Sequence, residues 1–164
     1  MAGVQTMHRG GVTVEIVDRT RAPLDHAAIA DLVAYVLEAE RAAPAELGLR
    51  FVGERAMRGL NAAHRGERGV TDVLSFPLEE PGEWPAGATG DRPPRLLGDV
   101  VVCPRQAARQ AAGDDTPAAY ELAVLVVHGV LHLLGWEHDE TQGAMGARQA
   151  ELLRSFDWSR LVGT

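Results

Sequence analysis

Three histidines near the C-terminal end, His128, His132 and His138, have a spacing suited to binding a metal ion. Neutral imidazole is the side chain that most often ligates metals. Because a helix turns once in 3.6 residues, His128 and His132 would lie on one face, a turn apart. Gly135 can adopt the positive φ that ends a helix and turns the chain back toward His138. Three protein ligands with a fourth position left open are typical of catalytic zinc.

The residues before these histidines indicate what positions them. Residues 122–127 are apolar on every side, which is typical of a helix buried in a core. Thr116 and Pro117 have the types expected of a cap and a first turn. A buried helix holds its side chains more rigidly than a loop does. We therefore expect the metal site on this long helix and on the turn that follows it.

Strand and helix patterns alternate through the rest of the chain, which predicts an α/β fold. We expect one domain over residues 1–164, with a small mixed sheet of about four strands covered by about five helices. Residues 79–95 are rich in proline, glycine and acidic residues and predict a flexible surface loop. The expected strands are 12–16, 47–51, 73–76 and 98–103, and the expected helices are 25–37, 54–64, one from 104, one from 117 and 142–156.

The composition is that of an ordinary globular protein, with 46% hydrophobic and 24% charged residues. No run of about 18 apolar residues predicts a membrane span, and residues 1–11 lack the apolar stretch of a secretion signal. The single cysteine, Cys103, excludes an internal disulfide and fits a reducing compartment. We expect a cytoplasmic protein.

Charge is unevenly distributed along the chain. The formal net charge of −7 argues against a generally basic surface for nucleic acid. Residues 50–68, however, hold five arginines against two glutamates. Such a cluster can be a solvated helix face, or it can form a local basic groove whose affinity for RNA falls with salt.

The order His-x3-His-x2-Gly-x2-His is also that of the metzincin peptidases. Those enzymes carry a glutamate directly after the first histidine, where it serves as the general base. Gly129 occupies that position here, so the usual proteolytic mechanism lacks its proton acceptor. A zinc peptidase would need a carboxylate from elsewhere in the chain.

The segment from His128 to His138 resembles the signature of the bacterial YbeY endoribonucleases, a zinc-dependent family of ribosomal RNA maturation. Further blocks at residues 60–65, 71–77 and 98–104 resemble the same family in the same order, and the resemblance extends over residues 47–156. The chain departs from the family at residues 136–137, where Trp-Glu replaces the usual Tyr-Asp. Its loop near residues 79–94 is also longer.

The resemblance implies a site and a substrate. His128, His132 and His138 would hold one Zn2+ ion per chain, and Arg65 would be the functionally important arginine. The implied activity is cleavage of single-stranded RNA in the maturation of the 16S rRNA 3′ end and in ribosome quality control. The implied partners are ribosomal RNA and the small ribosomal subunit, with no DNA specificity and no membrane.

The chemistry of these residue types fits phosphodiester cleavage. Zinc lowers the pKa of a coordinated water to about 7, and a guanidinium can neutralise charge on the phosphate. Arg65 is the candidate for that role, with Arg58 and Arg68 as further substrate-binding candidates. Glu137 and Asp139 can move a proton or orient an imidazole, or they can simply be solvated.

A different class of function is a non-catalytic ribosome-assembly factor with a structural zinc ion. A closed structural site has four protein ligands. Cys103 or Asp139 would then complete the shell, so the number of protein ligands at the metal distinguishes the two functions.

Overall fold

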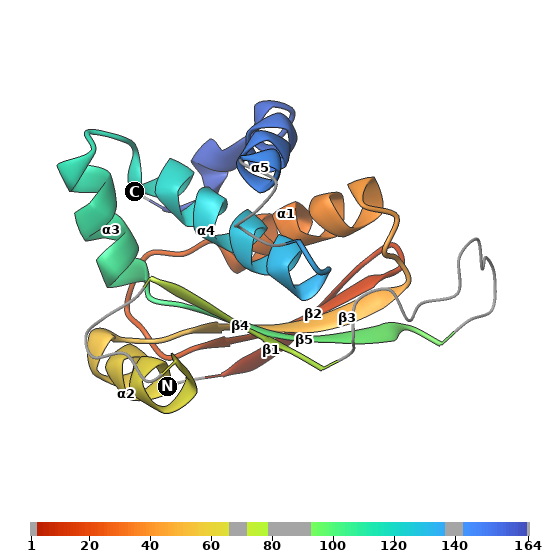
Figure 1. Cartoon of the computed structure of the whole chain (residues 1–164), viewed down its shortest axis with the longest axis horizontal. Coiled ribbons are helices and arrows are strands. Elements are labelled where there is room, and N and C mark those ends of the chain that lie inside the picture. The colour runs from red at the N-terminus through yellow and green to blue at the C-terminus, as the bar shows by residue number, and fades with distance from the viewer. Residues whose placement is uncertain (1–2, 66–71, 79–92, 137–142, 164) are drawn as a thin grey trace.

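A computed structural model of the chain describes residues 3–65, 72–78, 93–136 and 143–163. Over these residues the fold is a five-stranded mixed sheet with five α-helices, which confirms the expected α/β class (Figure 1). The strands are β1 Val4–Arg9, β2 Val12–Asp18, β3 Ala45–Phe51, β4 Val73–Pro77 and β5 Arg95–Val102. The helices are α1 His26–Ala39, α2 Glu54–Arg65, α3 Pro104–Gly113, α4 Ala118–Leu133 and α5 Ala144–Arg154, followed by the 3-10 turn Trp158–Leu161.

The sheet has the strand order β1-β2-β3-β5-β4. The three inner strands, β2, β3 and β5, are parallel, whereas the edge strands β1 and β4 are antiparallel to their neighbours. Alternation decides which side of β2 faces the core, because successive side chains point to opposite faces of a strand. Val12, Val14 and Ile16 are buried, and the intervening Glu15 is exposed.

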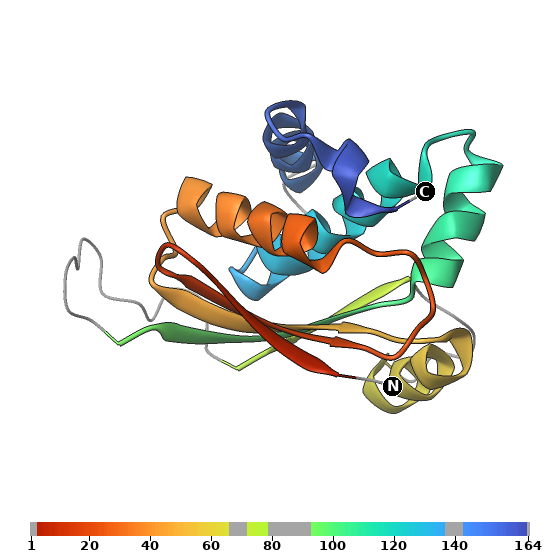
Figure 2. The same cartoon turned by 180° about the vertical axis from the view of Figure 1, so that it is seen from behind.

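The two faces of the sheet are covered differently (Figures 1 and 2). Helices α1 and α4 lie across one face, and α5 packs outside α4. Helix α2 lies at one end of the other face. Asp25 caps α1 by accepting a hydrogen bond from the backbone N–H of Ala28 at 3.0 Å, as its residue type predicts.

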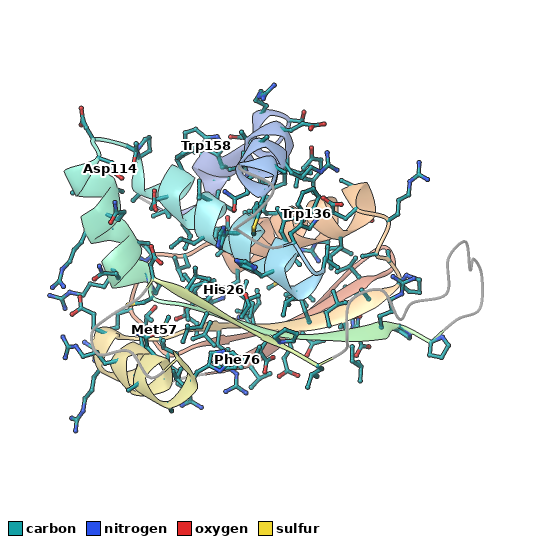
Figure 3. All side chains as sticks on the ribbon, viewed as in Figure 1. His26, Met57, Phe76, Asp114, Trp136 and Trp158 are labelled. Atoms are coloured by element: carbon teal, nitrogen blue, oxygen red, sulfur yellow. The ribbon has the colours of Figure 1, made fainter. Side chains whose placement is uncertain are left out.

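Two apolar clusters follow from this arrangement. The larger one fills the space between the sheet and α1 and α4. The smaller one lies under α2 and contains Met57, Leu74 and Val101, with Phe76 at its margin. Figure 3 shows Met57 and Phe76 on the opposite side of the sheet from Trp136. In the described part of the chain, no helix has the length and apolar character needed to cross a membrane.

Several element boundaries differ from those expected. Strand β1 was not predicted, because most of its side chains are exposed and it lacks a clear apolar alternation. Strand β5 begins at Arg95 and passes through Gly98, whose φ of +125° accompanies a shift of register against β3. Helix α4 begins one residue later than predicted, with Pro117 rather than Thr116 as its N-cap. The expected loop at 79–95 lies mostly outside the described residues.

Candidate functional site

The C-terminal half of α4 brings two of the predicted ligands together. The Nε2 atoms of His128 and His132 are 3.0 Å apart, and their ring centroids are 4.5 Å apart with an interplanar angle of 83°. Both side chains are half-buried. The i, i+4 spacing therefore places the two rings on one face of the helix, as expected.

Each ring has an oxygen close to its other nitrogen. His132 Nδ1 lies 2.8 Å from the backbone carbonyl oxygen of Trp136, and His128 Nδ1 lies 2.6 Å from Oε1 of Gln149 on α5. A carbonyl oxygen can only accept, so the Nδ1 atoms donate in this arrangement. In a neutral imidazole that donates from Nδ1, Nε2 carries the lone pair. The two Nε2 atoms face each other within hydrogen-bond distance, at 3.0 Å.

The turn after α4 fixes the orientation of His132. Gly135 has a φ of +100°, which confirms the conformation predicted for it. The N–H of Trp136 donates to the carbonyl of Leu131 at 3.0 Å, and the N–H of Gly135 donates to that of His132 at 3.0 Å. This pattern is typical of a glycine-terminated helix. The same turn places the Trp136 carbonyl beside the imidazole of His132.

The paired Nε2 atoms fit a metal ion. Two nitrogens bound to tetrahedral zinc at about 2.05 Å lie about 3.3 Å apart, close to the 3.0 Å separation observed here. At this separation the two nitrogens can share a proton or, when one is bound, a metal ion. Within the described residues, no third His, Cys, Asp or Glu completes a metal-binding group. His138, the predicted third ligand, lies outside those residues, as do Glu137 and Asp139.

Gly129 lies where helix α4 packs against the sheet. A Cβ at this position would overlap the Cγ1 methyl of Val100 on β5, so the helix approaches the sheet closely only because residue 129 is glycine. A side chain here would point into the core and away from the Nε2 pair. The position that carries the general base in metzincin peptidases therefore cannot supply one in this fold.

Strand β4 contacts both α4, the helix that carries the histidines, and α2. On one face of β4, the hydroxyl of Ser75 donates to the carbonyl of Gly129 at 3.0 Å. On the other face, the Phe76 ring contacts that of His64 at a centroid distance of 4.4 Å. Arg65 is the last residue of α2. β4 is an edge strand within the described residues, and Gly129 of α4 and His64 near the end of α2 contact opposite faces of it.

Arg58, a predicted substrate-binding residue, is paired with a carboxylate on its own helix. Arg58 lies on α2, on the face opposite α4, with Nη2 3.9 Å from Oε2 of Glu54. Glu54 also pairs with Arg105 at 3.6 Å and Arg109 at 2.6 Å on α3. Glu54, one of the two glutamates of residues 50–68, is thus shared between Arg58 and two arginines of α3. Arg68 lies outside the described residues.

A cleft of about 300 Å³ opens on the sheet face that α2 only partly covers. Exposed Arg19 and Arg50 line it together with the half-buried Asp99. The cleft was not predicted from the sequence, because Arg19 and Arg50 are distant in the chain and become neighbours only through the pairing of β2 with β3. Its remaining lining is apolar and consists of Val17, Val52, Leu60, Phe76 and Val101.

Cys103 is not part of the histidine site. Its side chain is buried in the smaller apolar cluster, next to the start of α3. Burial raises the pKa of its thiol above the usual 9.0. Within the described residues, Cys103 joins no group of three potential metal ligands, so the geometry gives no support to a structural zinc ion completed by Cys103.

Comparisons with known proteins agree on one family. The model of the family described as endoribonuclease YbeY matches residues 15–157. A protein named endoribonuclease YbeY from Acidothermus cellulolyticus is 40% identical over 156 residues, covering 92% of this chain and 95% of the relative. One of the same name from Thermobifida fusca is 39% identical over 148 residues, covering 88% and 94%.

A solved structure has the same fold. The solution structure of TM1509 from Thermotoga maritima aligns with a TM-score of 0.58 and covers 86% of this chain and 87% of its own. Its sequence identity of 23% is low, so this likeness concerns the fold alone.

Proposed function

The chain belongs to the endoribonuclease YbeY family, and from this we propose that it is a metal-dependent endoribonuclease that cleaves single-stranded RNA during ribosomal RNA maturation. The observation that supports metal dependence most strongly is the pair of Nε2 atoms 3.0 Å apart on α4. The substrate, the 16S rRNA 3′ end bound to the small ribosomal subunit, and the cytoplasmic location are parts of this proposal that come from the family resemblance.

The proposed metal is one zinc ion, held by His128, His132 and the predicted third ligand His138. When bound, it would supply a Lewis acid that activates water and withdraws charge from a phosphate oxygen. The protein's own contribution is rigidity. The buried helix α4 fixes the two imidazoles, and the Gly135 turn and Gln149 hold their Nδ1 atoms.

Arg65 is proposed to bind the phosphate whose bond is broken. A guanidinium has paired N–H donors that match phosphate oxygens, and it stays charged at any physiological pH. Arg65 ends α2, which contacts β4 through His64 and Phe76. A single RNA strand that crosses the β4 edge would reach both α2 and the face of α4 that carries the histidines. A duplex is wider and stiffer, so this path favours single-stranded RNA.

Cleavage of a defined single-stranded RNA tests the proposal. The full chain is compared in zinc-loaded and chelated forms with His132→Ala, which removes one imidazole of the Nε2 pair. His8→Ala is the matched control, because His8 is exposed on β1, at the opposite edge of the sheet from β4.

We expect zinc-loaded wild-type protein and His8→Ala to cleave the RNA, and chelated protein and His132→Ala to lose cleavage. The His132→Ala variant also controls for contaminating nuclease. Undiminished cleavage by His132→Ala would contradict the proposal.

A further inference from the structure

Four residues form a row across the sheet, on the face opposite α1 and α4. Strand pairing places Glu15, Gly48, Asp99 and Phe76 side by side on β2, β3, β5 and β4. A Cβ on Gly48 would overlap Oδ1 of Asp99, so the carboxylate lies over the glycine backbone. Glycine inside a strand often marks a close approach of this kind. On its other side, Asp99 has the aromatic side chain of Phe76 as its cross-strand neighbour.

The carboxylate of Asp99 has acceptor capacity left for a ligand. The side chain is half-buried and lines the cleft of about 300 Å³ on this face. Among the described residues, that side chain takes part in no hydrogen bond or ion pair. An ionised carboxylate only accepts, through two oxygens that lie side by side. Two adjacent N–H donors in one plane therefore match it best.

Two arginines line the same cleft. Arg50 is the next residue after Gly48 on this face of β3, and the backbone N–H of Arg19 donates to the carbonyl of Phe51 at 2.9 Å. Both side chains are exposed, and in the part of the chain that the structure describes neither belongs to an ion pair. Such guanidinium groups can bind RNA phosphates without first breaking a salt bridge.

We propose that this cleft is a subsite for one guanine base of a single-stranded RNA. The inference rests on the proposed function, because the occupant is drawn from the RNA substrate. Guanine is the one RNA base with two adjacent donors, N1–H and the N2 amino group, on its Watson–Crick edge, and Asp99 accepts from both. Phe76 and the apolar lining contact the ring. The volume of the cleft is at the small end of the range for ligand pockets, which suits one base.

The position of the cleft connects it to the proposed RNA path. The ring of Phe76, which lies on this face of the sheet (Figure 3), contacts that of His64 at 4.4 Å, one residue before the end of α2. Asp99 lies between β4 on this side and Arg50 of β3 on the other. One RNA strand can therefore extend from the β4 edge over Asp99 to the arginines. Asp99 reads the base, and the arginines bind phosphates.

Binding of short RNAs to the chelated full chain tests the subsite without cleavage. The probes are fluorescent oligoadenylates with a central guanosine, a central inosine or no substitution, and binding is followed by fluorescence anisotropy. Inosine keeps N1–H but lacks the N2 amino group. We expect wild type to bind the guanosine probe about 10-fold more tightly than the inosine probe, and the unsubstituted probe no more tightly than the inosine probe.

Two variants test the carboxylate itself. Asp99→Asn has nearly the same shape, and we expect it to lose the preference for guanosine. It should bind the unsubstituted probe at least as tightly as wild type, because a negative charge that repels RNA is removed. Gly48→Ala keeps the carboxyl group but displaces it, so the preference should be lost there too. Opposite changes for two probes in Asp99→Asn are not expected of a merely structural residue.

Two further variants separate charge from base recognition. Arg50→Gln should weaken binding of all three probes by a similar factor, because phosphate contacts carry no base information. Glu15→Gln is the matched control for Asp99→Asn. It removes a carboxylate from the same row but does not line the cleft, so the preference for guanosine should persist.

Equal affinity of wild type for the three probes, or a guanosine preference that persists in Asp99→Asn, would overturn the subsite. Neither result would affect the proposed function, which cleavage by the zinc-loaded protein tests separately. A guanosine preference that depends on Asp99, in a protein that cleaves no RNA when loaded with zinc, would contradict the proposed function and support the subsite. The comparison of probes on wild type needs no variant, so it stands even if a variant fails to fold.

Discussion

The two imidazole rings of α4 owe their orientation to atoms that lie outside that helix. The spacing of His128 and His132 predicted that they share a face, and Gly135 predicted the turn, because both follow from local helix geometry. The role of Gln149 was not predictable. Its contact with His128 spans 21 residues and exists only because α5 packs on α4. Local periodicity contains no information about such a contact.

Replacing Arg65 should separate RNA cleavage from metal binding. In Arg65→Ala the guanidinium that would stabilise charge on the phosphate is lost, so we expect cleavage to fall by at least about 100-fold. Zinc content and the thermal melting curve should be unchanged, because no predicted metal ligand is altered. Retained cleavage would remove Arg65 from the mechanism, and lost zinc would give it a structural role. Arg55→Ala, on the same helix, is the control.

The buried thiol of Cys103 should be unreactive in the folded protein. Burial raises its pKa, so little thiolate is present at neutral pH and the sulfur is shielded from reagents. A chromogenic disulfide reagent at pH 7 should release almost no colour until denaturant is added, and then one equivalent per chain, because the chain has one cysteine. Fast reaction without denaturant would show that the α3 end of the smaller cluster opens readily.

Helix α4 depends on its close approach to the sheet. In Gly129→Ala the new methyl group would overlap Val100, and overpacking of this kind costs about 1–3 kcal/mol. Gly146→Ala on α5 is the matched control, because a Cβ there meets no atom within 4 Å and alanine favours a helix by about 0.5–1 kcal/mol. Urea unfolding should show opposite signs for the two variants. A stabilising Gly129→Ala would contradict the packing described here.

The first turn of α4 contains a carboxyl group that is unfavourably placed. Burial, with the nearby carboxylates of Asp72 and Asp114, raises the pKa of Glu121 above its usual 4.5. The carboxyl of Glu121 therefore binds a proton more tightly in the folded state than in the unfolded state. Its contribution to the stability of the folded state falls as the pH rises from 4.5 to the raised pKa. We expect Glu121→Gln to be more stable than wild type at pH 7.

The stabilisation by Glu121→Gln should disappear below pH 4.5, where the carboxyl is protonated in both states. Urea unfolding at several pH values measures this difference. Glu38→Gln, at the exposed end of α1, controls for the change in net charge. A gain in stability that persists at low pH would show that Glu121 acts through packing and not through its charge.

The sheet as a whole was predictable in class but not in order. Apolar alternation identified β2 and β3, and an apolar run identified β5, because their buried faces leave a periodic signal. Strand β1 leaves none, since it pairs only with β2 and most of its side chains are exposed. Strand order also escaped prediction, and it is the order that places β4 at the edge between α2 and α4.

X-ray absorption at the zinc edge of the zinc-loaded protein shows whether imidazoles of α4 and of the segment after it hold the proposed metal ion. We expect nitrogen and oxygen donors only, with imidazole scattering that weakens in His132→Ala. A sulfur donor at about 2.3 Å, or a spectrum without imidazole scattering, would contradict it.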